Sequence, residues 1–222
     1  QARGCLVYNK TELDKLRVFL RDSAIAAPRN RKGVLGNPTT AVLASLHATQ
    51  YGFIGLQQTW QNRELRNYAL LQLLKNPVPL NATLSKSENP TWYTTPNKNE
   101  VASHLASQCV QVGLKVLLFS QSPRDTTAIA RRIDELVGEA CEPVAFDQTE
   151  DVYRGIALDE AGSMDVIMFP SQCSGCHNAN LLPSERSLVE SLFGRAGGIR
   201  ALAATATLAQ GMNLPADVVL IV

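Results

Sequence analysis

The fold is decided by the stretch from Lys115 to Asp125, which reads KVLLFSQSPRD. Its first half is a continuous apolar run that ends at Phe119-Ser120, the pattern of a strand buried on both faces. In its second half, Ser122 is placed to cap a helix, Pro123 suits the first helical position, and Asp125 is the capping-box partner. A buried strand that leads directly into a capped helix is the repeating unit of a parallel sheet.

Working outward, the same alternation continues to the end of the chain. Helices are predicted from about Asn99 to Val112, from Pro123 to Val137 and from about Ser184 to Phe193. Strands are predicted at 115–120, 166–169, 199–204 and 218–222. Strands that alternate with helices of about 10–15 residues indicate crossover connections. The predicted fold class is therefore α/β, a parallel sheet with helices on both faces.

The first hundred residues show a different pattern. A strand is predicted at 4–8, and Thr11 with Asp14 forms a capping box that opens an amphipathic helix. Apolar residues at helical spacing from 39 to 74 predict a small helical insertion at about 37–75, with His47 on its apolar face. Four prolines between 76 and 96 predict an extended connector that contains a short strand at 92–94.

Composition excludes some classes of protein. The 222 residues include 21 basic and 20 acidic side chains, a net charge of +1, which excludes a nucleic-acid binder that relies on a broad basic surface. It leaves open a contact made by a few well-placed groups. No apolar run approaches the roughly 18 residues that a membrane span needs, so no membrane partner is expected.

The cysteines and the two ends of the chain add further expectations. Five scattered cysteines favour a reducing compartment, so a cytoplasmic location is expected. The chain begins without Met and ends on the apolar run Val218–Val222. We therefore expect it to be a piece of a longer protein.

The strand-to-helix junction after Ser120 is the first candidate site. The start of a helix offers free backbone N–H groups and a partial positive charge, which together attract phosphate. Ser120, Gln121 and Ser122 add side-chain donors, and Arg124 adds a charge. Because every capped helix has similar free donors, a simple cap without a ligand remains an alternative.

The second candidate site follows the strand at 199–204 and reads AATATLAQGMNLP, residues 203–215. Thr207 and Gln210 again have capping-box spacing. The small residues allow another chain's backbone to come close, and Gly211 permits a tight turn. Hydroxyls such as those of Thr205 and Thr207, with backbone donors at a strand end, suit a sugar-phosphate chain.

Residues 204–215 resemble motif V of superfamily-two helicases, above all those of the superkiller type, with about eleven positions in agreement in a row. Residues 116–125 resemble motif IV of the same domain, an apolar strand that ends in Phe-Ser-Gln-Ser. The histidine-containing motif before motif V is resembled by His177 followed by Leu181-Leu182, Glu185-Arg186, Val189-Glu190 and Phe193. The resemblance covers 115–222; residues 1–114 match only loosely.

The resemblance implies a RecA-like fold and a place for the chain as the second RecA-like domain of an ATP-dependent helicase. That domain would span 1–222, be cut after motif V and carry the helical insertion. Thr205 would then contact a nucleic-acid phosphate, Ser120 to Ser122 would touch the backbone nearby, and His177 would lie near the nucleic-acid path. Gly211 and Asn213 would approach the nucleotide between the two RecA-like domains. The family commonly has two histidines followed by Ala-Gly, whereas here Asn178-Ala179-Asn180 follow a single histidine.

The implied cofactors are ATP and Mg²⁺, bound mainly by the first RecA-like domain, with DNA or RNA as the other partner. The Walker loop with its Lys, the acidic Mg²⁺ motif and the arginine-rich motif do not occur in this sequence. We therefore expect no catalytic residues in this chain, and no ATP hydrolysis by the chain alone.

Two alternatives remain open. The run from Cys173 to His177 spells C-x-x-C-H, which fits haem attachment, half of a zinc site, a redox pair, or an incidental pair of cysteines without a ligand, the interpretation we favour. For haem, Met168 or Met212 could be the second axial ligand, and for zinc a second ligand pair is required. The other alternative is a non-catalytic interaction module that binds a partner protein through the helical insertion.

Overall fold

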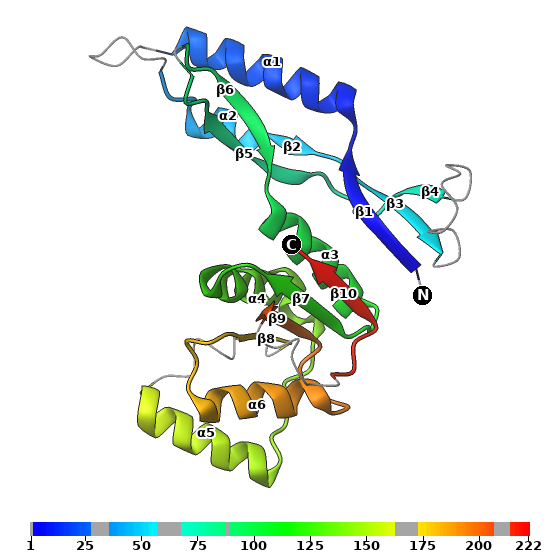
Figure 1. Cartoon of the computed structure of the whole chain (residues 1–222), viewed down its shortest axis with the longest axis vertical. Coiled ribbons are helices and arrows are strands. Elements are labelled where there is room, and N and C mark those ends of the chain that lie inside the picture. The colour runs from blue at the N-terminus through cyan, green and yellow to red at the C-terminus, as the bar shows by residue number, and fades with distance from the viewer. Residues whose placement is uncertain (1, 28–35, 57–67, 88, 163–172, 207–213) are drawn as a thin grey trace. The chain divides into compact units, whose positions relative to one another are not determined.

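The computed structural model describes residues 2–27, 36–56, 68–87, 89–162, 173–206 and 214–222, and the chain divides into two compact units, Gln1–Asn97 and Lys98–Val222 (Figure 1). The predicted strand at 166–169 lies outside these residues. Each unit has its own core and is described by itself.

The second unit is built on a parallel sheet. In its described part the strands are β7 (Val116–Ser120), β8 (Ser174–His177), β9 (Ala201–Thr205) and β10 (Val218–Ile221). They lie in the order β10-β7-β9-β8, and every neighbouring pair is parallel. The α/β class predicted from the sequence is confirmed, and the sheet agrees with a RecA-like fold.

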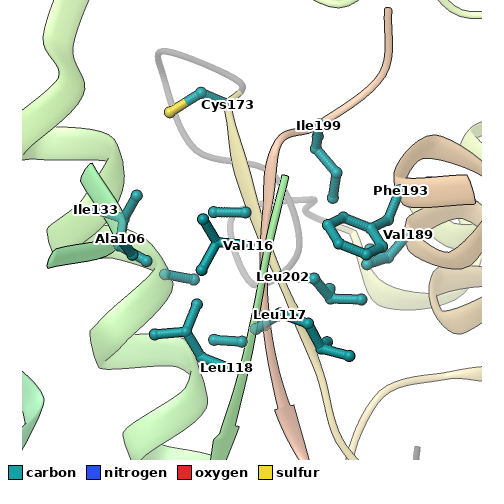
Figure 2. Packing of buried hydrophobic residues seen from close by; sticks show 14 of the residues in the cluster. Ala106, Val116, Leu117, Leu118, Ile133, Cys173, Val189, Phe193, Ile199 and Leu202 are labelled. Carbon is teal, nitrogen blue, oxygen red and sulfur yellow. The ribbon is translucent and has the colours of Figure 1, made fainter. Parts of the chain in front are cut away.

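Helices cover both faces of this sheet, as predicted. They are α3 (Lys98–Gln111), α4 (Pro123–Val137), the 3-10 turn η3 (Gly138–Ala140), α5 (Gln148–Ala161) and α6 (Pro183–Gly194). Figure 2 shows Ala106 of α3 and Ile133 of α4 on one side of the strands and Phe193 of α6 on the other. Helix α5 packs on α6. All five residues of β9 are buried, so the middle of the sheet is closed to water on both faces.

The start of α4 agrees with the capping pattern. The Ser122 hydroxyl accepts a hydrogen bond from the Asp125 N–H at 3.2 Å, and Pro123 opens the helix. Two elements had not been predicted. Helix α5 begins with a capping box between Asp147 and Glu150 and ends at Gly162, whose φ of 70° favours glycine. Strand β8 coincides with the C-x-x-C-H run, which had been considered only as a ligand motif.

The first unit contains antiparallel sheets. Its described elements are β1 (Ala2–Tyr8), α1 (Lys10–Ala26), α2 (Thr40–Ser45), β2 (His47–Ala48), β3 (Gln50–Leu56), β4 (Tyr68–Gln72), β5 (Val78–Leu84) and β6 (Trp92–Pro96). Within the described residues, β1, β3 and β4 form one sheet and β2, β5 and β6 another. Helix α1 packs on β6, and a small core gathers around Leu20, Leu46 and Leu80.

The predicted helical insertion at about 37–75 is wrong for most of its described residues. Only α2 is helical, whereas β3 and β4 occupy positions where helix was expected. The reason is long-range pairing: Gln50–Leu56 pairs residue by residue with β1, and these tertiary hydrogen bonds override the local apolar spacing. His47 consequently lies exposed in β2 rather than on a buried helical face.

Two smaller corrections concern the same unit. Asn9, and not Thr11, caps α1, because its side chain accepts hydrogen bonds from the N–H groups of Thr11 and Glu12. The expected connector at 76–96 contains the pair of strands β5 and β6, of which only the second had been predicted.

A buried ion pair joins α5 to α6. Glu150 is fully buried, and its carboxylate accepts hydrogen bonds from Arg195 Nε at 2.7 Å and Nη2 at 2.8 Å. Ser191 donates to the same carboxylate at 2.9 Å. The hydrogen bonds from Arg195 hold the pKa of Glu150 below its ordinary value, although burial acts in the opposite direction. The ion pair therefore stabilises the charged carboxylate inside the fold.

We predict that Glu150→Gln lowers the free energy of unfolding by about 2 kcal/mol at neutral pH, because it removes a buried charge-assisted contact. Since the folded-state pKa of Glu150 is depressed, this contribution is present above the ordinary value of 4.5 and is lost as the pH falls below it. Urea unfolding followed by circular dichroism should show that the difference in the free energy of unfolding between the variant and the unsubstituted chain becomes smaller at acid pH.

The matched control is Glu135→Gln. The Glu135 carboxylate pairs with Arg132 on the same unit, but its side chain is 53% exposed. The control should change stability by less than about 1 kcal/mol. Equal losses in the two variants would contradict the role given to the buried pair.

Candidate functional site

The carboxyl edge of the parallel sheet brings three of the sequence-predicted site residues together. Strand β7 ends at Ser120 and β9 ends at Thr205, and these two residues are aligned partners in adjacent parallel strands. His177 ends β8 and is aligned with Ala204 of β9. Since loops at this edge lead into helix starts, it is where open α/β sheets bind ligands.

The side chains that follow β7 divide into engaged and available ones. The Ser122 hydroxyl donates to the Asp125 carboxylate at 2.8 Å, and the Asn99 amide donates to the other oxygen of that carboxylate at 3.0 Å. Ser122 is therefore committed to the cap. Gln121 and Arg124 are exposed, and no hydrogen bond or ion pair among the described residues engages either side chain or the Ser120 hydroxyl. The exposed side chains of Gln121 and Arg124 can thus offer amide and guanidinium donors to an anion, whereas Ser120 is only 7% exposed.

His177 is held from the side of the sheet that α6 covers. Its Nε2 lies 2.7 Å from Glu190 Oε1, and the residue is only 6% exposed. Its Nδ1 is buried and has no hydrogen-bond partner. The carboxylate favours the tautomer in which Nε2 carries the proton and donates it. Sequence reasoning had not given Glu190 a role.

Alternate residues from 174 to 178 face the opposite side, toward α4. The Ser174 hydroxyl donates to the Ala130 carbonyl at 2.7 Å, and the Asn178 amide donates to the Thr126 hydroxyl at 3.1 Å. Between them, the Cys176 sulfur lies 3.7 Å from the Thr127 hydroxyl, which donates to it. We call these contacts of Ser174, Cys176 and Asn178 the β8–α4 polar row. A period of two in 174–178 is the sequence signal that could have revealed it.

The polar row explains the C-x-x-C-H run in structural terms. Cys173 and Cys176 are buried in the core, at 2% and 0% exposure, so neither sulfur is presented to a haem group. The redox interpretation needed the pair at the start of a helix, but Cys176 lies within a strand. Burial raises the pKa of the Cys176 thiol to about 11, so the reactive thiolate is scarce near neutral pH.

The predictions of a metal site and of nucleotide contacts concern residues that lie partly outside the described part of the chain. No group of three or more His, Cys, Asp or Glu residues that could hold a metal ion occurs there. Thr207, Gly211 and Asn213 lie outside the described residues, as do Met168 and Met212. None of the helices that are described is long and apolar enough to cross a membrane.

An open hollow of about 820 Å³ lies beside the start of α4. Pro123, Arg124 and Thr127 of α4 line it together with Asn178, Asn180 and Leu182 of the segment that follows β8. The first turn of α4 and the β8–α6 loop therefore face the same space.

Comparison with known proteins identifies several relatives, although no protein-family model matches the chain. The RQC trigger complex helicase SLH1 of Saccharomyces cerevisiae is 34% identical over 226 residues, which cover 94% of this chain and 11% of that protein. Activating signal cointegrator 1 complex subunit 3 of Danio rerio is 52% identical over 127 residues, 55% of this chain and 8% of that protein. The DExH-box ATP-dependent RNA helicase DExH14 of Arabidopsis thaliana is 30% identical over 126 residues, 55% of this chain and 6% of that protein. The chain thus spans only about a tenth or less of the length of these relatives.

We predict that the native chain reacts with iodoacetamide at Cys5, which is exposed, and not at Cys173 or Cys176. Burial blocks access to both of these sulfur atoms. The Cys176 thiol, with a pKa of about 11, is in addition almost entirely protonated at mildly alkaline pH. Peptide mass spectrometry of the labelled chain gives the order of reaction. Labelling in urea is the control, and equal labelling of all five cysteines without urea would contradict the buried arrangement.

Proposed function

The chain belongs to the superfamily-two helicases of the superkiller type, and from this membership we propose that it supplies the second RecA-like domain of an ATP-dependent helicase. Within that helicase it grips the backbone of a nucleic acid. We propose RNA as the nucleic acid, because the Arabidopsis relative is named an RNA helicase.

One observation carries the proposal: Ser120 and Thr205 end adjacent parallel strands in the same register. Their residues therefore sit side by side at the ligand-binding edge of the sheet, although 85 positions separate them in the sequence (205 − 120). Resemblance assigns both to backbone-contacting motifs. The parallel pairing of β7 with β9 supports this assignment, because consecutive phosphates of one nucleic-acid strand could meet the hydroxyls of both residues.

In this proposal, binding of the RNA backbone depends on a few local groups rather than on a broad positive electrostatic field. The chain's net charge is only +1, so long-range attraction to RNA is weak. Hydroxyl donors, the partial positive charge at the start of α4 and the guanidinium of Arg124 act only at short range. Such contacts position a sugar-phosphate backbone without reading its bases, which suits a protein that moves along RNA of any sequence.

The rest of the cycle is assigned to the whole helicase. ATP and Mg²⁺ are held mainly by a first RecA-like domain, with Gly211 and Asn213 approaching the nucleotide from this chain. ATP binding closes the two domains and hydrolysis reopens them, so that this domain's grip forms one half of a ratchet. A reducing compartment such as the cytoplasm is part of the proposal, because all five cysteines are free thiols.

We predict that Thr205→Val in the full-length helicase lowers RNA-stimulated ATP hydrolysis about tenfold. The reason is that the variant lacks the Thr205 hydroxyl, which the proposal places against a phosphate of the bound RNA. Valine keeps the side-chain volume and suits a buried strand end, so the fold should persist. Steady-state ATPase assays across an RNA titration measure the effect.

Two controls sharpen the Thr205 experiment. Thr205→Ser keeps the hydroxyl and should retain most of the stimulation. ATPase without RNA should be unchanged in Thr205→Val. If Thr205→Val is stimulated as strongly as the unsubstituted helicase, the assignment of Thr205 to the backbone grip fails.

We also predict that the 222-residue chain by itself hydrolyses no ATP, with or without RNA. Phosphoryl transfer requires a phosphate-cradling Lys loop and Mg²⁺ carboxylates, and the sequence contains no Walker loop. A phosphate-release assay on the isolated chain tests this, with the full-length helicase as the positive control. RNA-stimulated turnover by the isolated chain would overturn the division of labour between the two domains.

A further inference from the structure

We propose that Asn178 is a positioning residue, which fixes the first turn of α4 at the carboxyl edge of the sheet and thereby sets where Arg124 meets the RNA backbone. This inference rests on the proposed function. It concerns a position where the chain departs from the family pattern, since Asn178-Ala179-Asn180 stand where a second histidine and Ala-Gly are common.

The contacts of Asn178 reach both elements that meet at this edge. Its side-chain N–H donates to the Thr126 hydroxyl at 3.1 Å, and that hydroxyl donates to the Pro123 carbonyl at 2.7 Å. Its side-chain oxygen accepts the N–H of Asn180 at 3.0 Å, which shapes the loop after β8. Asn178 is 2% exposed and Thr126 is fully buried. A chain of buried hydrogen bonds therefore runs from the end of β8 to the first residue of α4.

The position of this contact along α4 gives it a role that the contact of Ser174 lacks. Thr126 lies in the first turn, beside Pro123 and Arg124, whereas Ser174 meets α4 farther along, at Ala130. Ser174 and Asn178 are four positions apart along extended chain, a distance of about 13 Å. Both contacts stabilise the packing of α4 on the sheet, but of the two residues only Asn178 contacts the turn that presents Arg124.

The arrangement links the two junctions that the proposed grip uses. Strand β9 carries Thr205 and pairs with β8, and β8 leads directly to Asn178. The first turn of α4 follows β7, which pairs with β9 on its other edge. Asn178 joins the end of β8 to this first turn. The spacing between Arg124 and Thr205 therefore does not depend on the loop after β7 alone.

The test compares Asn178→Ala with Ser174→Ala in the full-length helicase. Each removes one buried donor to α4. We expect Asn178→Ala to raise the RNA concentration for half-maximal ATPase roughly tenfold, because a misplaced binding group loses contact without losing its chemistry. The ATP concentration for half-maximal rate should not change. Ser174→Ala should lower stability and leave both concentrations unchanged.

A second variant and a second measurement keep the proposal falsifiable if Asn178→Ala folds poorly. Thr126→Val removes the partner hydroxyl at nearly constant volume, and it should raise the half-saturating RNA concentration to the same extent. The double variant should be no worse than either single one. Amide hydrogen exchange should show faster exchange at 124–127 in Asn178→Ala and not in Ser174→Ala.

The outcomes separate this inference from the proposed function. If RNA does not stimulate the unsubstituted helicase, the proposed function fails and this inference fails with it. If RNA stimulates it but Asn178→Ala behaves as Ser174→Ala does, only the positioning role is overturned. Unchanged hydrogen exchange at 124–127 in Asn178→Ala overturns the positioning role whatever the kinetics show.

Discussion

The parallel register between β7 and β9 is the constraint on which the second unit depends. Each strand is buried on both faces, so neither can shift by one residue without turning its apolar side chains to the wrong helix layer. Figure 2 shows the result, with side chains from neighbouring strands directed to the helices on both sides. The register that packs this core also aligns Ser120 with Thr205. Core packing and site geometry therefore have one physical cause.

Strand β8 extends that constraint to the polar groups. Because helices cover both faces of this strand, alternate residues must make hydrogen bonds to α4 on one side and to α6 on the other. Ser174, Cys176 and Asn178 meet α4, while His177 meets Glu190 of α6. The cysteines are part of this packing, and the burial that makes them good core residues also raises the pKa of Cys176. A motif that suggests metal or haem chemistry in the sequence is thus explained by alternation on a strand.

Charged side chains also join the helices to the sheet at its opposite edge, where β7 begins. The Lys115 ammonium, at the beginning of β7, donates to the carbonyls of Phe193 and Arg195 at 2.6 and 2.7 Å. It supplies positive charge at the end of α6, which has no basic residue in its own last turn. Glu150 then ties Arg195 to α5. The helices on this face are therefore held to the sheet and to one another by charged groups at their ends.

Predictability from the sequence differed between the two units for a physical reason. In the second unit much of the decisive information is local: an apolar run, a cap such as Ser122 and a helix of ordinary length predict β7, α4, α6 and β9, although α5 and β8 were missed. The first unit depends on pairings between distant residues, such as Cys5 with Phe53, which leave no local signal. The helical spacing at 39–74 was therefore misleading. At the site, Ser120 and Thr205 were predictable because strand ends converge in a parallel sheet, whereas Asn178 and Glu190 were not, since their roles depend on which face of β8 each residue meets.

A near-neutral chain can still bind a polyanion firmly if its donors are held in place before the ligand arrives. Each mobile donor loses conformational entropy on binding, which offsets much of its contact energy. Here strand ends and a capped helix start carry the candidate donors, so their backbone is ordered in advance, although the exposed side chains of Gln121 and Arg124 still have rotamer entropy to lose. The buried contacts of Asn178 and Thr126 hold the helix start on the side where the strands alone do not. In the proposed function, rigid placement of the donors would take the part that a basic surface plays in many nucleic-acid-binding proteins.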